Sequence, residues 1–343
     1  MKPNVLVVRL DSDGDVLVTG PAIRAVSAGA KRVTLLCGPR GRQAASLLPG
    51  VHRLVVHRAA WIDPEPEPID LRTATALVEE LTAIEADEAV VFTSFHQSAL
   101  PTALLLRMAG IRRIGAISDD YPGSLLDVRH RVDDDVHEVE RALSLAAACG
   151  YELPYGDDGR LDVERRPFSL PFDGDYVVVH PGTSVPARAW PAERHRELVE
   201  ALIASGRRVV VTGSSDERGL TAAVAGPPHP DVVDLGGATT LPELAEVLAG
   251  ASAVVVGNTG PAHLAAAVGS AVVSLFSPVV PAVRWRPWRV PHVLLGDQLS
   301  SCAGSRAREC AVPGHPCLAS VSPADVMDAL EELAPLPQEV TTL

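Results

Sequence analysis

Lysine is almost absent from this sequence, and positive charge is scarce overall. Only Lys2 and Lys31 are lysines, and 30 basic residues face 43 acidic ones, which leaves a formal net charge of −13 over 343 residues. Binding a nucleic acid requires a basic surface that neutralises phosphates, so the charge balance argues against a nucleic acid partner. It also argues against broad adhesion to an anionic membrane surface.

Long hydrophobic runs are missing as well. No segment reaches the roughly 18 consecutive apolar residues expected of a membrane span. The longest candidate, residues 264–276, is interrupted by Gly269, Ser270 and Ser274. The apolar stretch at the amino terminus is too short for a signal peptide and is broken by Arg9. We therefore expect a cytoplasmic protein with no membrane span and at most peripheral membrane contact.

Two familiar binding motifs are absent too. The junction between the first predicted strand and the helix after it carries only Gly14 and Gly20, which lie too far apart for the G-x-G-x-x-G dinucleotide fingerprint. This argues against a nicotinamide or flavin enzyme. The acidic run that begins at Asp11 lacks the glycine and glutamate of a calcium loop, because Val16 and Ala22 occupy those positions.

The cysteines do not form a disulfide pattern, because their number, five, is odd. Three of them, Cys302, Cys310 and Cys317, cluster around His315 and could hold a metal ion. Their spacing lacks a paired C-x-x-C, since Ser305 stands where a second cysteine would complete one. We favour reduced cysteines that pack in the core, and no metal site.

What the sequence does contain is an alternation of β-branched runs and helical patterns, which is typical of βαβ units and parallel sheets. The length predicts about two domains. Strands are predicted at Val5–Leu10, Arg32–Cys37, His52–Val56, Ala89–Phe92, Tyr176–His180, Arg208–Thr212, Asp231–Leu235, Ala253–Val256, Ala271–Phe276 and His292–Leu295. Helices are predicted after the first strand, from Pro261 onward, and at Asp70–Ala83, Ser98–Ala109, Asp135–Ala148, Ala192–Ser205, Leu241–Leu248 and Pro323–Leu333.

The best linker candidate is Tyr151–Asp175, which is rich in proline, glycine and charge. The predicted fold is therefore α/β, with two doubly wound Rossmann-like domains facing across a cleft. We place the first domain at residues 1–160, the second at 172–322 and a final helix with its tail at 323–343.

In such folds, ligands bind outside the carboxyl ends of the strands. Asp15 follows Gly14 at the end of the first strand and is the preferred functional carboxylate there, whereas Asp11 and Asp13 read as N-capping residues. Asp13 is kept as a candidate ligand contact. Ser94 and His96 follow a later strand and are candidate ligand contacts too, although a plain polar loop is an equal alternative.

The second domain offers a helix start at Asn258, Thr259, Gly260, Pro261 and His263. Helix N–H groups there suit a pyrophosphate, although a well-capped helix with a satisfied histidine is the alternative.

Two more strand exits end at the same edge of the second sheet. Thr183, Ser184 and Arg188 form a loop suited to phosphate. Glu217, in the next exit, is a candidate for ribose hydroxyls. Three such exits together predict a nucleotide pocket.

Taken in order, these segments resemble glycosyltransferase family 9, the ADP-heptose heptosyltransferases. The matching motifs are Arg9-Leu10-x-Ser12-x-Gly14-Asp15-Val16 with Pro21-Ala22-x-Arg24, His180-Pro181-Gly182 through Arg188-x-Trp190-Pro191, and Asn258-Thr259-Gly260-Pro261-x-His263-Leu264-Ala265. Arg141 and the cysteine-rich tail add weaker matches.

The resemblance implies a GT-B fold with an acceptor-binding first domain, a nucleotide-sugar-binding second domain, and a final helix that packs back on the first. It implies inverting transfer without metal or cofactor, from an ADP-sugar such as ADP-heptose. Asp15 would be the general base. Asp13, Ser94, His96 and, more weakly, Arg141 would be acceptor contacts. Arg188 and the helix start at Thr259 would stabilise the departing ADP, and Glu217 would contact the nucleoside.

The sequence departs from the family pattern at two positions. Arg188 stands where lysine is usual, and Asn258 where aspartate is common. A GT-B-like nucleotide-sugar epimerase and a non-catalytic nucleotide-binding protein remain alternatives. The acceptor is left open between a glycan, a lipid-linked molecule and a small molecule.

Overall fold

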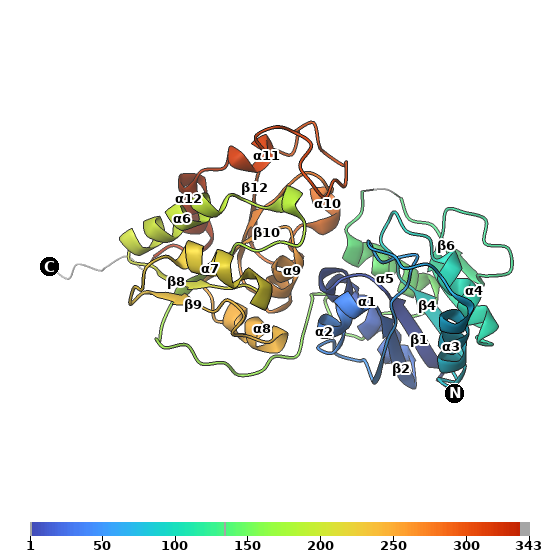
Figure 1. Ribbon diagram of the computed structural model, residues 1–343. Coiled ribbons are helices and arrows are strands. Elements are labelled where there is room, and N and C mark those ends of the chain that lie inside the picture. Colours follow the sequence, from blue (N-terminus) through green and yellow to red (C-terminus); the bar gives the residue numbers. More distant parts are fainter. Residues whose placement is uncertain (1, 134, 337–343) are drawn as a thin grey trace. The chain divides into compact units, whose positions relative to one another are not determined.

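The computed structural model describes residues 2–133 and 135–336. The chain divides into two compact units, Met1–Glu164 and Arg165–Leu343. Each unit holds a six-stranded parallel sheet flanked by helices (Figure 1). The predicted α/β class with two doubly wound domains is confirmed.

The sheet of the first unit has a topological switch point at its centre. The strand order is β3-β2-β1-β4-β5-β6, so the chain reverses its direction of travel across the sheet between β1 and β4. In open α/β sheets this switch point is where ligands bind. The strands are β1 (Asn4–Arg9), β2 (Arg32–Cys37), β3 (Arg53–Val56), β4 (Glu88–Val91), β5 (Arg113–Ile117) and β6 (Val128–His130). The helices are α1 (Asp13–Gly29), α2 (Arg42–Ala45), α3 (Leu71–Thr82), α4 (Leu100–Met108) and α5 (Glu138–Ala148), with a 3-10 turn η1 (Pro39–Gly41).

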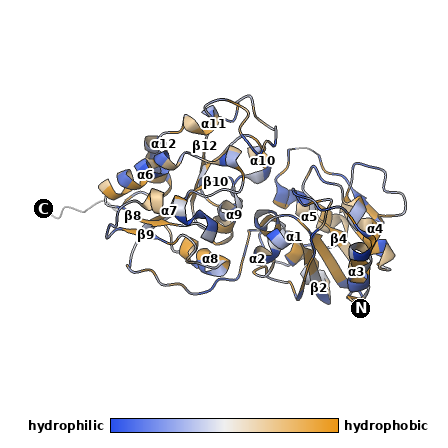
Figure 2. Cartoon of the chain, in the orientation of Figure 1, coloured by the Kyte–Doolittle hydropathy of each residue, from blue (hydrophilic) through white to orange (hydrophobic). Residues whose placement is uncertain are grey.

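Apolar strands form the core of this unit. Strand β1 is buried from Val5 onward, and it reads as a continuous apolar run because both faces of a parallel sheet are covered. Helices α3 and α4 pack on the face that carries Leu6 and Val8. Figure 2 shows the strands mainly in hydrophobic colours and the outer helices with hydrophilic faces.

The second unit repeats the plan. Its strand order is β12-β11-β10-β7-β8-β9, which puts the switch point between β7 and β10. The strands are β7 (Tyr176–His180), β8 (Arg208–Val211), β9 (Val232–Asp234), β10 (Ala253–Gly257), β11 (Val272–Leu275) and β12 (His292–Leu295). The helices are α6 (Ala192–Ala204), α7 (Arg218–Ala225), α8 (Leu241–Ala249), α9 (Gly260–Ala267), α10 (Ala282–Trp285), α11 (Pro316–Ala319) and α12 (Pro323–Leu333), with 3-10 turns η2 (Pro186–Arg188) and η3 (Ser215–Glu217).

The division between the units lies later than residue 160. Leu161 and Val163 are buried, and the Glu164 N–H donates to the Leu47 carbonyl within the first unit. The Arg166 N–H donates to the Pro242 carbonyl within the second. The stretch predicted as a linker therefore belongs mostly to the first unit, which it joins through this packing.

The final helix corrects another expectation. The resemblance implied that it packs on the first domain, but α12 packs against α6 and the strands β10, β11 and β12. Val326, Ala329 and Leu330 are buried in the core of the second unit. Its apolar face is thus used within its own unit. The tail beyond residue 336 lies outside the described residues.

The structure also corrects two local expectations. Helix α5 begins at Glu138, three residues later than predicted, because His137 caps it and Asp135 adopts a positive φ of 67°. Strands β5 and β6 were not predicted. Within the described residues, no helix combines the length and the apolar character that a bilayer crossing needs.

Candidate functional site

In the first unit, a buried arginine organises the switch point between β1 and β4. Arg9 is the last residue of β1, and its side chain is 3% exposed. Its Nη2 lies 3.0 Å from Asp15 Oδ1 and donates to Ser94 Oγ, also at 3.0 Å. The Ser94 hydroxyl lies 3.3 Å from the same Asp15 oxygen. The structure therefore brings together Asp15 and Ser94, two of the predicted site residues.

Asp15 occupies the third position of α1 and closes a capping box. Its Oδ2 accepts hydrogen bonds from the Ser12 hydroxyl at 2.7 Å and from the Ser12 N–H at 3.3 Å. Burial raises the pKa of Asp15, but the charge of Arg9 and the Ser12 hydrogen bonds outweigh it, so the pKa lies below its usual value. Asp15 is therefore ionised at neutral pH, and 17% of its side chain remains exposed.

Asp11 lies on the other side of Arg9. Its Oδ2 is 2.9 Å from Arg9 Nε, and its Oδ1 accepts a hydrogen bond from the Gln97 side chain. Burial raises the pKa of Asp11 to about 6, against the opposing charge of Arg9. Asp11 was expected to cap the helix. The structure corrects this, because Asp15 is the carboxylate in the capping box.

A second ion pair lies close enough to Arg9 to act on its charge. Arg141 and Glu138, on α5, are both buried, with 4.0 Å between Arg141 Nε and Glu138 Oε2. Burial would lower the pKa of Arg9, but the charges of Asp11, Asp15 and Glu138 raise it. Arg141 thus joins the cluster through Glu138, as part of its buried support.

Two predicted acceptor residues lie outside this cluster. Asp13 accepts a hydrogen bond from the Ala44 N–H at 2.9 Å and so ties α1 to α2. Burial raises its pKa to about 6. His96 is exposed, and its ring contacts Phe95 with 5.2 Å between centroids. Asp13 therefore has a structural partner in place of the expected N-capping role.

Sequence reasoning missed Arg9, Gln97 and Glu138 as members of the cluster. Arg9 did carry a signal, because a charged residue at the end of an otherwise buried strand requires a partner. Gln97 and Glu138 gave none, since polar residues in a loop and in a first helical turn are common.

In the second unit, the exits of β7, β8, β10 and β11 meet at one edge of the sheet. Arg188 Nη1 donates to the Asn258 carbonyl at 3.2 Å, which joins the β7 loop to the start of α9. Trp190 is buried, and its indole N–H donates to the Val321 carbonyl at 3.1 Å. The C-terminal part of this loop is thus fixed at both Arg188 and Trp190.

The Asn258 side chain is committed to the protein. Its Nδ2 donates to the Ser277 carbonyl, and its Oδ1 accepts from the Ser277 N–H, both at 3.3 Å. Ser277 Oγ in turn donates to the Ala187 carbonyl at 2.8 Å. Asn258 was predicted to contact the donor, and that contact stays a prediction. Within the protein, its amide joins the ends of β10 and β11 and its backbone carbonyl holds Arg188.

Glu217 bridges the exits of β7 and β8. Its Oε2 accepts from the Ser214 N–H at 2.8 Å and from the Ser214 hydroxyl at 2.9 Å. The carboxylate lies so close to Gly182 that a side chain at that position would overlap it. Glycine is therefore needed at 182 for Glu217 to reach this place, where its second oxygen remains next to the β7 loop.

Helix α9 begins at this edge with Gly260 and Pro261 in its first turn. Thr259, the N-cap residue, does not cap it through its side chain. The helix dipole favours an anion at such an end. His263 is buried in the first turn, and its ring centroid lies 6.1 Å from that of Trp285 on α10.

Thr183 and Ser184 lie in the β7 loop itself. Thr183 Oγ1 accepts from the Val185 N–H at 3.2 Å, in a local turn that shapes the loop. Ser184 is exposed. Of the two, Ser184 keeps its side chain available to a ligand.

The cysteines of the tail lie in the core behind this edge. Cys302 and Cys317 are buried in the core of the second unit, and Cys310 packs against it. Across residues 2–133 and 135–336, no group of three or more His, Cys, Asp or Glu side chains is arranged to hold a metal ion.

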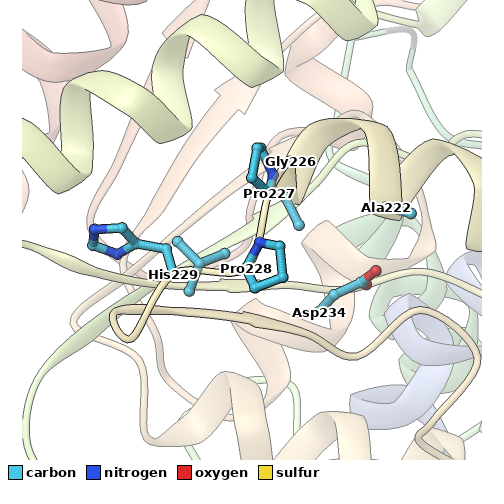
Figure 3. Close-up of a pocket in the computed structure, with 8 residues that line it drawn as sticks. Ala222, Gly226, Pro227, Pro228, His229 and Asp234 are labelled. Carbon is cyan, nitrogen blue, oxygen red and sulfur yellow. The ribbon is translucent and has the colours of Figure 1, made fainter.

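A separate pocket of about 250 Å³ lies between the end of α7 and β9 (Figure 3). His229 and Asp234 lie at opposite ends of it in the view, with Pro227 and Pro228 between them. None of its lining residues is among the predicted site residues. We therefore assign the candidate site from the strand ends, where the polar side chains converge.

Comparison with known proteins agrees with this architecture. The sequence matches the family described as Glycosyltransferase family 9 (heptosyltransferase) over residues 74–314. Lipopolysaccharide heptosyltransferase 1 of Pseudomonas aeruginosa is 35% identical over 199 residues, 54% of each chain. The alignments to the first curated relatives span between a third and just over half of their length, from 34% to 54%.

Solved structures share the fold over nearly the full length. A family 9 glycosyltransferase from Veillonella parvula has a TM-score of 0.79 at 18% identity, with 97% of each chain covered. The E. coli heptosyltransferase WaaC with ADP has a TM-score of 0.72 at 23% identity, with 96% of this chain and 100% of that chain covered. The two parallel-sheet units thus have the GT-B architecture, and the family match covers most of the chain. The protein belongs to glycosyltransferase family 9, the heptosyltransferase family.

Proposed function

We propose that this protein is an inverting, metal-independent glycosyltransferase. It would transfer a heptose or a related sugar from an ADP-sugar to a hydroxyl of a glycan, lipid-linked or small-molecule acceptor. Membership of family 9 is the observation that carries this proposal, and the similar heptosyltransferase WaaC of E. coli was solved with ADP. The polar side chains at the two sheet edges are the candidates for binding the substrates and for catalysis.

The first unit would supply the general base. Asp15 is the partly exposed carboxylate at the switch point, and Arg9 and Ser12 keep it ionised, which is the form that accepts a proton. Its lowered pKa makes it a weak base. It would take the acceptor proton as the new bond to the anomeric carbon forms, when the hydroxyl has become acidic.

The second unit would hold the donor. The start of α9 suits the pyrophosphate, and Arg188 lies beside it through the Asn258 carbonyl. As the sugar departs, negative charge grows on the diphosphate, where a cation and a helix dipole are most stabilising. Glu217, in the neighbouring loop, would accept hydrogen bonds from the ribose.

The first experiment compares thermal stabilisation by ADP, UDP, GDP and NAD at equal concentrations. A ligand at a hundredfold excess over its Kd stabilises by roughly 2.7 kcal/mol, which we expect for ADP alone. A preference for UDP or GDP would overturn the donor assignment. The absence of any stabilisation would overturn nucleotide binding itself.

Two variants then separate the proposed roles. Asp15→Asn should abolish transfer and leave ADP affinity unchanged, whereas Arg188→Ala should weaken ADP binding. Near-normal turnover of Asp15→Asn would contradict the base assignment. Transfer should also survive dialysis against EDTA, and loss of activity that added metal restores would refute metal independence.

A further inference from the structure

Asp11 has no role in the function proposed above, yet only the Arg9 side chain separates it from Asp15, the proposed base. Its carboxylate is 9% exposed and is held between two partners. Arg9 Nε lies 2.9 Å from Oδ2, and the Gln97 side chain donates to Oδ1. Gln97 also accepts a hydrogen bond from the Ser94 N–H at 3.0 Å, so Asp11 is fixed to the same loop as Ser94.

Arg9 is shared between two carboxylates. Its Nε lies against Asp11, and its Nη2 lies 3.0 Å from Asp15 Oδ1. The guanidinium is almost fully buried, so charges around it interact more strongly than they would in water. Two anions that share one cation also repel each other. Each anion is therefore stabilised less, in net terms, than it would be if it faced the cation alone.

We propose that Asp11 is a positioning residue that maintains the basicity of Asp15 by sharing the charge of Arg9. Asp11 touches neither substrate in this proposal, and it acts only through the guanidinium. The inference rests on the proposed function of Asp15 as general base.

The groups that act electrostatically on this pair come from several surrounding elements. Asp11 faces Arg9 on β1, Asp15 on α1, Arg40 on η1 and the Gln97 amide after β4. Arg9 also feels the charge of Glu138 on α5.

The two carboxylates change charge in different pH ranges. Burial raises the pKa of Asp11 to about 6, whereas Asp15 titrates below its usual range. Between pH 5 and 7, Asp11 therefore gains its charge while Asp15 stays ionised. Once Asp11 is ionised, Arg9 is shared and Asp15 becomes the stronger base. The transfer rate should accordingly rise with pH through about 6.

The test is the pH profile of kcat in the full-length protein. Asp11→Asn and Asp11→Ser should remove the rise near pH 6 and lower kcat at pH 7.5 about three- to tenfold, with KM for both substrates unchanged. Asp11→Glu, which keeps the charge, should retain the rise. Asp157→Asn is the matched control, because it breaks another Arg–carboxylate pair of the first unit, 2.7 Å between Arg24 Nε and Asp157 Oδ2, and should keep the rise.

A direct titration separates this inference from the proposed function. The carboxyl ¹³C resonance of Asp15, assigned with Asp15→Asn, should titrate at a lower pH in Asp11→Asn and Asp11→Ser than in the wild type. An unchanged Asp15 titration, or a kcat loss with the rise retained, overturns the role of Asp11. A lowered titration in a protein that transfers no sugar supports the coupling and overturns the proposed function.

Discussion

The clamp between Asn258 and Ser277 predicts that Asn258→Asp destabilises the second unit in a pH-dependent way. The amide donates to one Ser277 backbone atom and accepts from another, both at 3.3 Å, and Asn258 is 5% exposed. An ionised aspartate can accept from the Ser277 N–H but faces the Ser277 carbonyl with an oxygen in place of a donor. A buried, unsatisfied acceptor costs about 1–3 kcal/mol, and more if it is charged.

The sign of the pH dependence follows from the same geometry. Burial and the opposing carbonyl raise the folded-state pKa of the new carboxyl above its unfolded value. A protonated carboxyl can donate to Ser277 and restore the clamp, so the stability is present at acidic pH and lost as the pH rises through the raised pKa. At pH 8 we expect a loss of about 2 kcal/mol, which corresponds to a fall of about 4–8 °C in the Tm of a unit of this size.

The measurement is calorimetry of wild type and variant at pH 5 and pH 8. Gln43→Glu makes the same amide-to-acid change at an exposed position and should leave the Tm within about 1 °C, as surface substitutions usually do. Equal Tm values for Asn258→Asp and wild type at pH 8, or a larger loss at pH 5 than at pH 8, would refute the clamp.

Two other predictions concern the edge of the second sheet. Gly182→Ala should push Glu217 out of place and weaken ADP binding by about 1–2 kcal/mol, which is about five- to thirtyfold. Gly219→Ala on α7, where nothing lies within 4 Å of the added carbon, should leave ADP binding unchanged. Equal ADP affinities of the two variants in titration calorimetry would contradict the role of Glu217. Burial lowers the pKa of His180 to about 4 and the pKa of His195 to about 3. Their contribution to stability is therefore present above pH 6.5 and is lost as the pH falls toward these values. At pH 5 the loss is about 2 kcal/mol for each histidine. His195→Gln should therefore reduce the loss of Tm between pH 7 and 5, and an unchanged loss would refute this origin.

Most of the fold could be predicted from the sequence because parallel strands buried on both faces read as continuous apolar runs. Strands such as β2 and β7 were predicted at their observed bounds. Strand β5 escaped because it begins with a charge and contains Gly115, where the Cys149 sulfur leaves no room for a side chain. The place of α12 escaped for a different reason. An amphipathic helix shows which face is buried but not which sheet buries it.

For the candidate site, the sequence indicates which positions lie at strand ends, but it says less about their contacts. Strand ends and helix starts are visible in the sequence, and they led to Asp15, Arg188, Glu217 and the start of α9. The clamp on Asn258 was not visible, because Ser277 follows a different strand and acts partly through its backbone. A backbone partner leaves no mark on the identity of the residue that supplies it.

The acidic run at the start of α1 shows why such contacts decide chemistry. Asp11, Asp13 and Asp15 are spaced two residues apart, but the chain turns from strand to helix between them, so they point in different directions. Asp15 folds back onto Ser12, three residues away, whereas Asp13 meets Ala44 31 residues away and Asp11 meets Gln97 86 residues away. Only the nearest of these partners can be inferred from local sequence rules. The charge states of Asp11 and Asp13 depend on segments that the fold brings in from elsewhere in the chain. The run therefore comes to hold one strongly acidic group, Asp15, and two weakly acidic groups only after folding.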